Sequence, residues 1–441
     1  MLTALSLCTR FWGLFDPREV VWDEVHYEGF VGAYVNHTQY LDVHPPLGNL
    51  LLALAAKVLG IPGIALAALQ PTPMLRVLPA LAGSLIIPVV YLLLRELGSG
   101  RRVGTLGAAL LLVDNALLVE SRFILPDSML LLFGMTAVLL YVAARRRGGP
   151  SRWAFLTASA VAAGMAASIK WTGLSALGLI LLTWAADAVW QRRDIRSLLK
   201  EGVVLAAVPA AIYVASFAVH FAQLSSAIPE TRAPFVRAFL DLNHRMSAIN
   251  VGWATDSNAS ASPWYTWPIS KHSIGFWSSN AAGPGAERWI VLVGNPVVWW
   301  GALIGMAAVV AAMIRRRTEL AKVHRVMLFL SAGYALNFVP FAFIRRPMYL
   351  YHYIFALIFS LMLAAVGVGA LAGWTADDGA APWRFATRRS AMLYCSIIGL
   401  AALVFVYLAP LSYGLPLDAT GLLHRRWLLE RHVSLPEWLH R

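Results

Sequence analysis

The stretch LYHYIFALIFSLMLAAVGVGAL, at residues 350–371, is the clearest guide to the fold of this chain. It contains no Asp, Glu, Lys or Arg, and about 20 apolar residues in a helix are enough to cross the hydrocarbon core of a bilayer. The rest of the chain has the same character: 59% of its 441 residues are hydrophobic and 13% are charged, whereas a soluble domain carries roughly 25% charged residues. The sequence therefore predicts an all-α integral membrane protein with many spans.

Apolar runs of roughly 17–25 residues recur along the chain and predict about eleven transmembrane helices in one domain, residues 1–441. The expected spans are 1–15, 78–94, 103–119, 128–144, 153–169, 173–190, 202–220, 294–314, 326–344, 350–371 and 390–409. The first is short and contains Arg10. A shorter apolar stretch at 45–59 is expected to be an interfacial or re-entrant helix.

Basic residues indicate how the spans are oriented. They gather in the loops next to the inner ends of the spans, and these are Arg95, Arg101 and Arg102; Arg145, Arg146 and Arg147; Arg192, Arg193, Arg196 and Lys200; Arg315, Arg316, Arg317, Lys322 and Arg325; and Arg384, Arg388 and Arg389. Because cytoplasmic loops carry such an excess, we expect these loops and the N-terminus in the cytoplasm. The net charge of +13 is explained by them, and no nucleic-acid binding is expected.

The outer side then receives the segments 16–77, 120–127, 221–293 and 345–349 and the C-terminal tail. The first of these carries an acidic pair, Asp23 and Glu24, in VVWDEVHY at 20–27. The pair could simply be solvated at the interface. The apolar residues around it favour partial burial instead, which raises a carboxyl pKa and makes a usable general base.

His44 follows in DVHPPLG at 42–48. Two interpretations are open for His44. It could do no more than precede the start of a helix, since proline suits the first turn, or it could orient a carboxylate or a sugar hydroxyl. Glu120, Arg122 and Asp127 allow two interpretations as well: an internal ion lock, or a site in which the forked donors of Arg122 face a lipid phosphate. Lys170 ends a helix and either snorkels to the interface or serves an anion.

Arg345 and Arg346 lie on the outer side, against the cytoplasmic bias, which is easiest to explain if they meet an anion. His352, in the Tyr-His-Tyr run that follows, belongs either to an aromatic belt at the interface or to a substrate site.

The segment 221–293 is the only sizeable soluble part of the chain and contains Trp264, Trp267 and Lys271. Aromatic rings there either anchor the loop to the bilayer or stack on a sugar or peptide. The two cysteines, Cys8 and Cys395, predict neither a disulfide framework nor a cysteine metal site.

Taken together and in order, these segments resemble the protein O-mannosyltransferases, membrane enzymes of the GT-C glycosyltransferase class. The resemblance covers nearly the whole chain. It rests on LSLCTRF at 5–11, VWDEVHY at 21–27, DVHPPLG at 42–48, SRFILPDS at 121–128, SIKWTG at 168–173, GNPVVWW at 294–300, MYLYHY at 348–353 and APLSYG at 409–414.

The resemblance implies a polyprenyl-phosphate mannose donor, transfer to Ser or Thr hydroxyls of secreted proteins, and inversion at the anomeric carbon. The family's catalytic Asp-Glu pair maps onto Asp23 and Glu24, and its outer arginine maps onto Arg122. We expect Asp23 to be the general base and Glu24 to orient the acceptor or tune Asp23. The arginines at 122, 345 and 346, with Lys170, would stabilise the leaving phosphate. His44, Trp264, Trp267, Lys271 and His352 are the expected contacts to donor or acceptor.

The chain departs from the family pattern at three places. Asn49 stands where a lysine is common, Pro126 replaces the usual leucine, and the lectin-like insert of the eukaryotic members is missing. The missing insert concerns acceptor choice more than the chemistry, and it suggests a prokaryotic protein in the cytoplasmic membrane, with its active site on the outer face.

No metal or other cofactor is expected, because such a phosphate is already a good leaving group. The expected partners are the lipid-linked donor, secreted acceptor proteins and the bilayer; a homodimer is left open. Two rival functions remain. A GT-C enzyme that glycosylates a lipid or glycan would use the same residues, and a transporter or flippase would need ionisable groups near the midplane, whereas here they gather at the outer helix ends.

Overall fold

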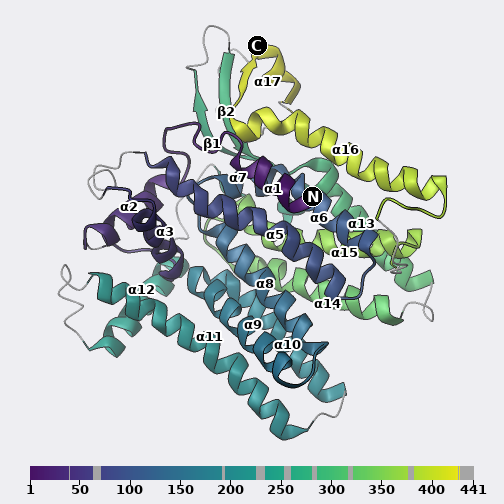
Figure 1. The fold of residues 1–441 in the computed structure, drawn as a ribbon. Helices are drawn as coiled ribbons and strands as arrows, with labels where there is room; N and C mark the ends of the chain where they lie inside the picture. The colour runs from purple at the N-terminus through teal and green to yellow at the C-terminus, as the bar shows by residue number, and fades with distance from the viewer. Residues whose placement is uncertain are drawn as a thin grey trace.

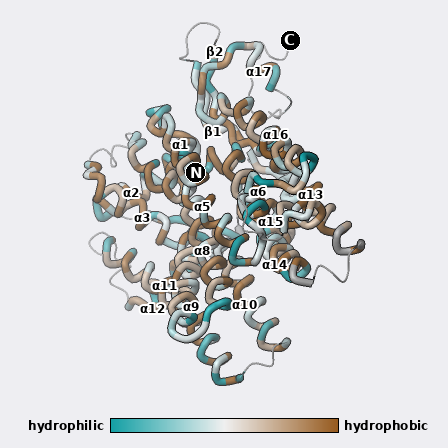
Figure 2. Tube along the Cα trace, turned by 45° about the vertical axis from the view of Figure 1, so that its right-hand side comes forward, coloured by the Kyte–Doolittle hydropathy of each residue, from teal (hydrophilic) through white to brown (hydrophobic). Residues whose placement is uncertain are grey.

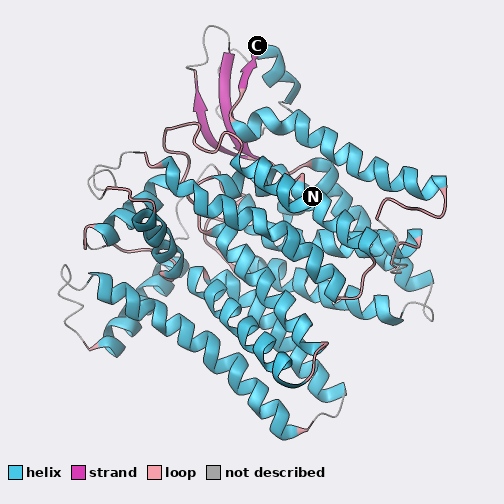
Figure 3. Ribbon diagram, in the orientation of Figure 1, coloured by secondary structure: helices cyan, strands magenta, loops and turns pink. Residues whose placement is uncertain are grey.

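The computed structural model describes residues 1–38, 40–62, 71–190, 194–224, 234–252, 260–280, 286–315, 321–375, 382–425 and 427, and it is mostly helical (Figures 1 and 3). The longer helices are α5 (Val77–Glu96), α8 (Asp127–Arg145), α9 (Gly149–Ile169), α10 (Leu174–Trp190), α11 (Ile195–Leu224), α12 (Phe235–Gly252), α13 (Pro296–Arg315), α14 (Ala321–Phe338), α15 (Ile354–Ala372) and α16 (Arg388–Tyr413). The shorter ones are α1 (Leu2–Phe11), α2 (Glu24–Val35), α3 (Leu47–Val58), α6 (Arg101–Leu112), α7 (Asn115–Arg122) and α17 (Ala419–Arg425).

Short 3₁₀ helices and strands complete the secondary structure. They are η1 (Pro73–Arg76), η2 (Trp171–Gly173), η4 (Trp264–Ile269), η5 (Val339–Phe343) and η6 (Leu350–Tyr353), with β1 (Ile274–Ser279), β2 (Ala286–Leu292) and β3 (Pro416–Asp418). The expected interfacial helix at 45–59 corresponds to α3, and α2 is a further helix in the same outer segment.

The expected class, a polytopic helical membrane protein, is confirmed. Within the described ranges, eight helices are long and apolar enough to cross a membrane, and α6 with α7 would make a ninth if their 61° bend interrupts one span. That bend has a local cause: Asp114 caps α7 by accepting a hydrogen bond from the Leu117 N–H at 2.8 Å, so a new helix begins inside the expected span 103–119.

The expected first span is shorter than predicted. α1 has 10 residues and ends just before Gly13, whose φ of +58° suits the left-handed turn that closes a helix. The apolar part of α13, Pro296–Ala311, is also short for a span.

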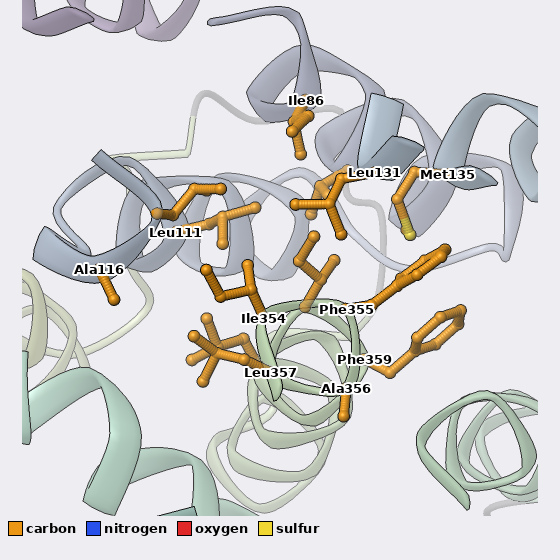
Figure 4. Packing of buried hydrophobic residues seen from close by; sticks show 14 of the residues in the cluster. Ile86, Leu111, Ala116, Leu131, Met135, Ile354, Phe355, Ala356, Leu357 and Phe359 are labelled. Carbon is orange, nitrogen blue, oxygen red and sulfur yellow. The ribbon is translucent and has the colours of Figure 1, made fainter. Parts of the chain in front are cut away.

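α15 is the central helix of the bundle. It is apolar on all sides and buried along nearly its whole length, as expected for a helix surrounded by others. Its residues Phe355 and Phe359 point toward Met135 of α8, and Leu111 of α6 and Ile86 of α5 lie on the same side of α15 (Figure 4). Helices α13 and α14 pack on its other side. Because α15 comes from the C-terminal half, this packing joins the two halves of the chain.

The basic loops gather at one end of the bundle. Arg147 pairs with Glu96 at 3.2 Å, Arg145 with Asp187 and Arg152 with Glu201, which ties together the ends of α5, α8, α9, α10 and α11. Between the helix ends the chain is mostly hydrophobic (Figure 2). The expected outer segments meet at the opposite end.

A small antiparallel sheet at that opposite end was not predicted. Its strands lie in the order β1-β2-β3, with Ile274 opposite Leu292 and Glu287 opposite Leu417. The run at 289–293 is rich in β-formers, but we predicted only that 221–293 is a soluble segment and predicted no strands in it. The chain is therefore not purely α-helical, and its C-terminal segment is held to the outer segment by β3.

Two glycines on α13 allow the close packing of α13 on α15 to be tested. A Cβ on Gly305 would lie 2.3 Å from the Cβ of Ala364 on α15, whereas a Cβ on Gly301 would meet nothing within 4 Å. Gly305→Ala should lower stability by about 1–3 kcal/mol, the usual cost of overpacking. Gly301→Ala should be neutral or stabilising by up to ~1 kcal/mol. Thermal unfolding in detergent measures both, and equal midpoints for the two variants would contradict this packing.

Candidate active site

A buried ion pair holds the first outer segment in place. Arg76, at the end of η1, donates from Nε and Nη2 to the two carboxylate oxygens of Glu24, each at 2.7 Å. Both side chains are about 1% exposed. Such a bidentate arginine–carboxylate contact fixes the orientation of both groups as well as their distance.

The same pair satisfies backbone groups from several segments. Glu24 also accepts from the N–H groups of Val21 and Ile124, both at 2.9 Å. Arg76 donates further to the carbonyls of Pro17 at 2.6 Å and Glu19 at 3.0 Å. The acidic loop is thereby attached to the start of α5 and to the turn between α7 and α8.

Asp23 is the half-buried member of the acidic pair. It occupies the N-cap position of α2, yet its side chain accepts no capping hydrogen bond, which leaves the carboxylate available. Partial burial raises the pKa of Asp23; nearby His26 and Lys170 oppose this, and Asp127 adds to it. No side chain in the described ranges hydrogen-bonds to this carboxylate or pairs with it.

Lys170 and Asp127 form a second ion pair beside Asp23. The Lys170 Nζ lies 2.6 Å from Asp127 Oδ2, and it also lies 5.7 Å from the centre of the Tyr351 ring. Asp127 begins α8 and Lys170 ends α9, so the pair joins adjacent helix ends. Lys170 therefore does not snorkel to water; it faces the site.

His44, Arg346 and His352 come together with this pair. Burial lowers the pKa of His44 well below its usual range, and the positive charges of Lys170 and Arg346 and the nearby His352 act in the same direction. Burial also lowers the pKa of Arg346, against the opposing influence of Tyr351 and Tyr349. In the described ranges no carboxylate pairs with Arg346. Arg345, next to it, is exposed.

Aromatic side chains form one wall of the site. The Trp22 ring stacks on Phe276 of β1 with centres 5.2 Å apart and meets Tyr349 edge-on at 6.3 Å. Trp22 has a φ of +51°, and a strained backbone beside a carboxylate is typical of functional sites. The Trp22 N–H donates to the Phe276 carbonyl at 3.1 Å, so the sheet supports the loop that carries Asp23.

The structure does not bring Arg122 to this site. Its guanidinium is buried and donates to the carbonyls of Arg10, Trp12 and Gly13 at 2.6–2.9 Å, and it lies over the ring of Tyr413. This corrects the expected contact to a donor phosphate. The alternative, a set of salt bridges among residues 120, 122 and 127, is not formed either, because Asp127 pairs with Lys170.

The large outer loop also differs from expectation. Trp267 has 0% exposure; its Nε1 donates to Ser262 at 2.9 Å and its ring stacks on His352. It cannot stack on an acceptor and instead positions His352. Trp264 packs edge-on against Phe338, and Lys271 is exposed.

Three residues of the site were not in the predicted set. Arg76 had a detectable signal, an arginine on the outer side against the charge bias, and Asp127 had been noted only as part of a lock. Tyr351 lies near Asp23, Asp127 and Glu120. Among the described residues, no group of three or more His, Cys, Asp or Glu is placed to hold a metal ion.

The site thus places the unpaired Asp23 carboxylate near two cations, Lys170 and Arg346, at the end of the helical bundle away from the basic loops. Such an arrangement is suited to removing a proton next to an anionic leaving group.

Solved structures share this architecture. The S. cerevisiae protein O-mannosyltransferase Pmt1-Pmt2 complex bound to the sugar donor matches with a TM-score of 0.84 at 16% identity, over 100% of this chain and 94% of that chain. ArnT from Cupriavidus metallidurans bound to undecaprenyl phosphate matches with a TM-score of 0.56 at 20% identity, over 97% of this chain and 72% of that chain. The fold is therefore that of the GT-C membrane glycosyltransferases.

The chain belongs to the protein O-mannosyltransferase family. The family profile described as "Dolichyl-phosphate-mannose-protein mannosyltransferase" matches residues 1–225, and the "C-terminal four TMM region of protein-O-mannosyltransferase" matches residues 235–431. The expected resemblance is confirmed.

Curated relatives are similar over half of the chain. Protein O-mannosyltransferase 1 of Drosophila melanogaster is 34% identical over 249 residues, which are 52% of this chain and 28% of that protein. Protein O-mannosyl-transferase 1 of Rattus norvegicus is 34% identical over 242 residues, which are 50% of this chain and 32% of that protein. The chain thus matches about a third of the length of these relatives.

Removing Arg76 tests the buried pair. Arg76→Met should destabilise the protein by about 3–5 kcal/mol, because it leaves the Glu24 charge buried without a partner. The double variant Glu24→Gln/Arg76→Met should recover much of that loss. Arg237→Met, at an exposed pair on α12, is the control and should leave the unfolding transition unchanged. Unfolding curves in detergent compare the variants; a single variant as stable as the parent protein would refute the role of the pair.

Proposed function

We propose that this protein transfers mannose from a polyprenyl-phosphate donor to Ser or Thr hydroxyls of secreted proteins, with inversion at the anomeric carbon. The observation that carries the proposal is the unpaired Asp23 carboxylate near Lys170, with Arg346 near Tyr349 and His44. Family membership, the names of the relatives and the donor-bound yeast complex support the donor and the acceptor class.

Asp23 acts as the general base in a single displacement. The acceptor hydroxyl forms a bond to the anomeric carbon while its proton passes to Asp23. The bond from that carbon to the phosphate oxygen breaks, and the phosphate leaves with the bonding electrons. The raised pKa of Asp23 makes it a stronger base than an ordinary aspartate, and its half-buried position excludes much of the competing water.

Cations on the other side of the site stabilise the leaving phosphate. Arg346 is free to offer its planar fork of donors, and exposed Arg345 adds charge at the entrance. Lys170 is held by Asp127, so it contributes a fixed charge. His44 and His352 lie near these cations, and in this proposal they contact the sugar or phosphate. Glu24 does not contact substrates in this proposal; it positions Asp23 through the pair with Arg76.

The position of the site in the bundle supports a reaction on the outer face of the membrane. Asp23 lies at the end of the bundle away from the basic loops, and those loops are typical of the cytoplasmic side. The site would then face the outside of a prokaryotic cytoplasmic membrane, where secreted acceptors emerge. The donor's prenyl tail would remain in the bilayer.

The test is a transfer assay. The purified protein in lipid nanodiscs is incubated with radiolabelled polyprenyl-phosphate mannose and a Ser/Thr-rich peptide. Labelled mannose linked to the peptide is the expected product. Label found only in lipid or free glycan acceptors would instead support the rival GT-C function, and uptake into vesicles without transfer would support a transporter.

Asp23→Asn should reduce transfer by about 10²–10⁴-fold, the usual contribution of a general base, while donor binding persists. Asp241→Asn, at an exposed carboxylate on α12, is the control. In the parent protein kcat/KM should fall as the pH falls, with an apparent pKa above the ~3.9 of an ordinary aspartate, since the protonated form cannot accept a proton. Near-normal turnover of Asp23→Asn would remove Asp23 from the mechanism.

Transfer should continue in excess EDTA. A divalent ion on a sugar phosphate takes oxygen ligands from carboxylates as well; here Glu24 is held by Arg76 and Asp127 by Lys170. Initial rates with EDTA, and after adding Mg²⁺ or Mn²⁺, measure this. If EDTA abolishes transfer and Mg²⁺ or Mn²⁺ restores it, Asp23 would become a metal ligand and the base would be another group.

A further inference from the structure

Glu120 is a buried carboxyl group that the mechanism above does not use. It lies on α7, and its side chain is about 1% exposed. Its Oε2 is fully buried and has no hydrogen-bond partner. In the described ranges no lysine, arginine or histidine pairs with it. An unpaired carboxyl group inside a membrane protein is costly, and such groups usually serve function.

The surroundings of Glu120 place it at the site. The charged groups that act on it are Asp127, Lys170 and Asp23, and Tyr351 is close to all three carboxylates. Arg122, two residues further along α7, reaches the other way, toward the end of α1. Lys170, the lysine that acts on Glu120, is paired with Asp127 at 2.6 Å. Helix α7 therefore holds a carboxyl group with an unsatisfied oxygen near Asp23.

The chemistry of a carboxyl group restricts what can satisfy it. A carboxyl group accepts hydrogen bonds in either protonation state and donates one when it carries a proton. A phosphate ester only accepts, whereas hydroxyls both donate and accept and so match the group in either state. A pair of neighbouring hydroxyls can donate to both oxygens. Within the described residues no set of three ligands is arranged for a metal ion. These facts favour the sugar ring over the phosphate or a cation.

We propose that Glu120 binds hydroxyl groups of the donor's sugar ring and thereby selects the sugar that is transferred. This inference rests on the proposed function, because it concerns the same site and donor. Glu120 is a specificity-determining residue here: it holds the sugar in place while Asp23 receives the acceptor's proton.

The test compares binding of donors that differ by one hydroxyl. Polyprenyl-phosphate mannose and its 2-, 3-, 4- and 6-deoxy forms carry the same charge and the same lipid, and their Kd values are measured with the full chain in nanodiscs. The parent protein should bind at least one deoxy donor about 10–100-fold more weakly, the range for leaving a buried polar group without its hydrogen-bond partner. In Glu120→Gln, that donor and the intact donor should bind within about threefold of each other.

Glu28→Gln is the matched control. Glu28 is also buried and its Oε2 also lacks a hydrogen-bond partner, but the charges that act on it are Glu24 and Arg76 rather than Asp23. This variant should keep the full penalty for the deoxy donor. If Glu120→Gln does not fold, Glu120→Asp, which keeps the carboxyl group but shortens its reach, should show the same loss of discrimination.

Two results would overturn the inference: a penalty that persists in the Glu120 variants, or a parent protein that binds all the deoxy donors as tightly as the intact one. A parent protein that shows the expected binding pattern, yet transfers no mannose to any acceptor, would support the role of Glu120 and contradict the proposed function alone.

Discussion

The ion pair between Glu24 and Arg76 is the constraint on which the geometry of the site depends. Its two charges lie away from water and are compensated by each other and by backbone groups from the 14–21 loop and from Ile124. Because a buried charge without a partner is so unfavourable, these segments can adopt essentially one arrangement. Asp23, next in the chain to Glu24, is held at the start of α2 as a result.

Residues of the same charge have different roles at this end of the protein. Of the two adjacent carboxylates, Glu24 is used to build the loop and Asp23 stays open to the substrates. Arg122 supports the end of α1 through three carbonyls, whereas Arg346 has no carboxylate partner among the described residues. In each comparison the group with protein partners is structural, and the group that lacks them carries the proposed chemistry.

The sequence predicted much of the fold because the bilayer imposes a strong pattern. Apolar length located the helices, and charge bias separated the basic end from the site end. It did not predict the break at Asp114, which depends on one capping side chain, or the β3 strand, which pairs with residues more than a hundred positions away. For the site, Lys170, His44, Arg346 and His352 are brought together as expected. Arg122 and Trp267 are not, because only the packed structure shows that carbonyls and Ser262 already satisfy them.

The central claim is that Asp23 supports a single displacement at the anomeric carbon. The most direct measurement is the anomeric configuration of the mannosyl peptide, determined by NMR after transfer from a donor of known configuration. The account predicts the opposite configuration to that of the donor, because the hydroxyl attacks from the face away from the phosphate. Retention of the donor's configuration would contradict it, since that outcome requires two displacements and a covalent sugar intermediate.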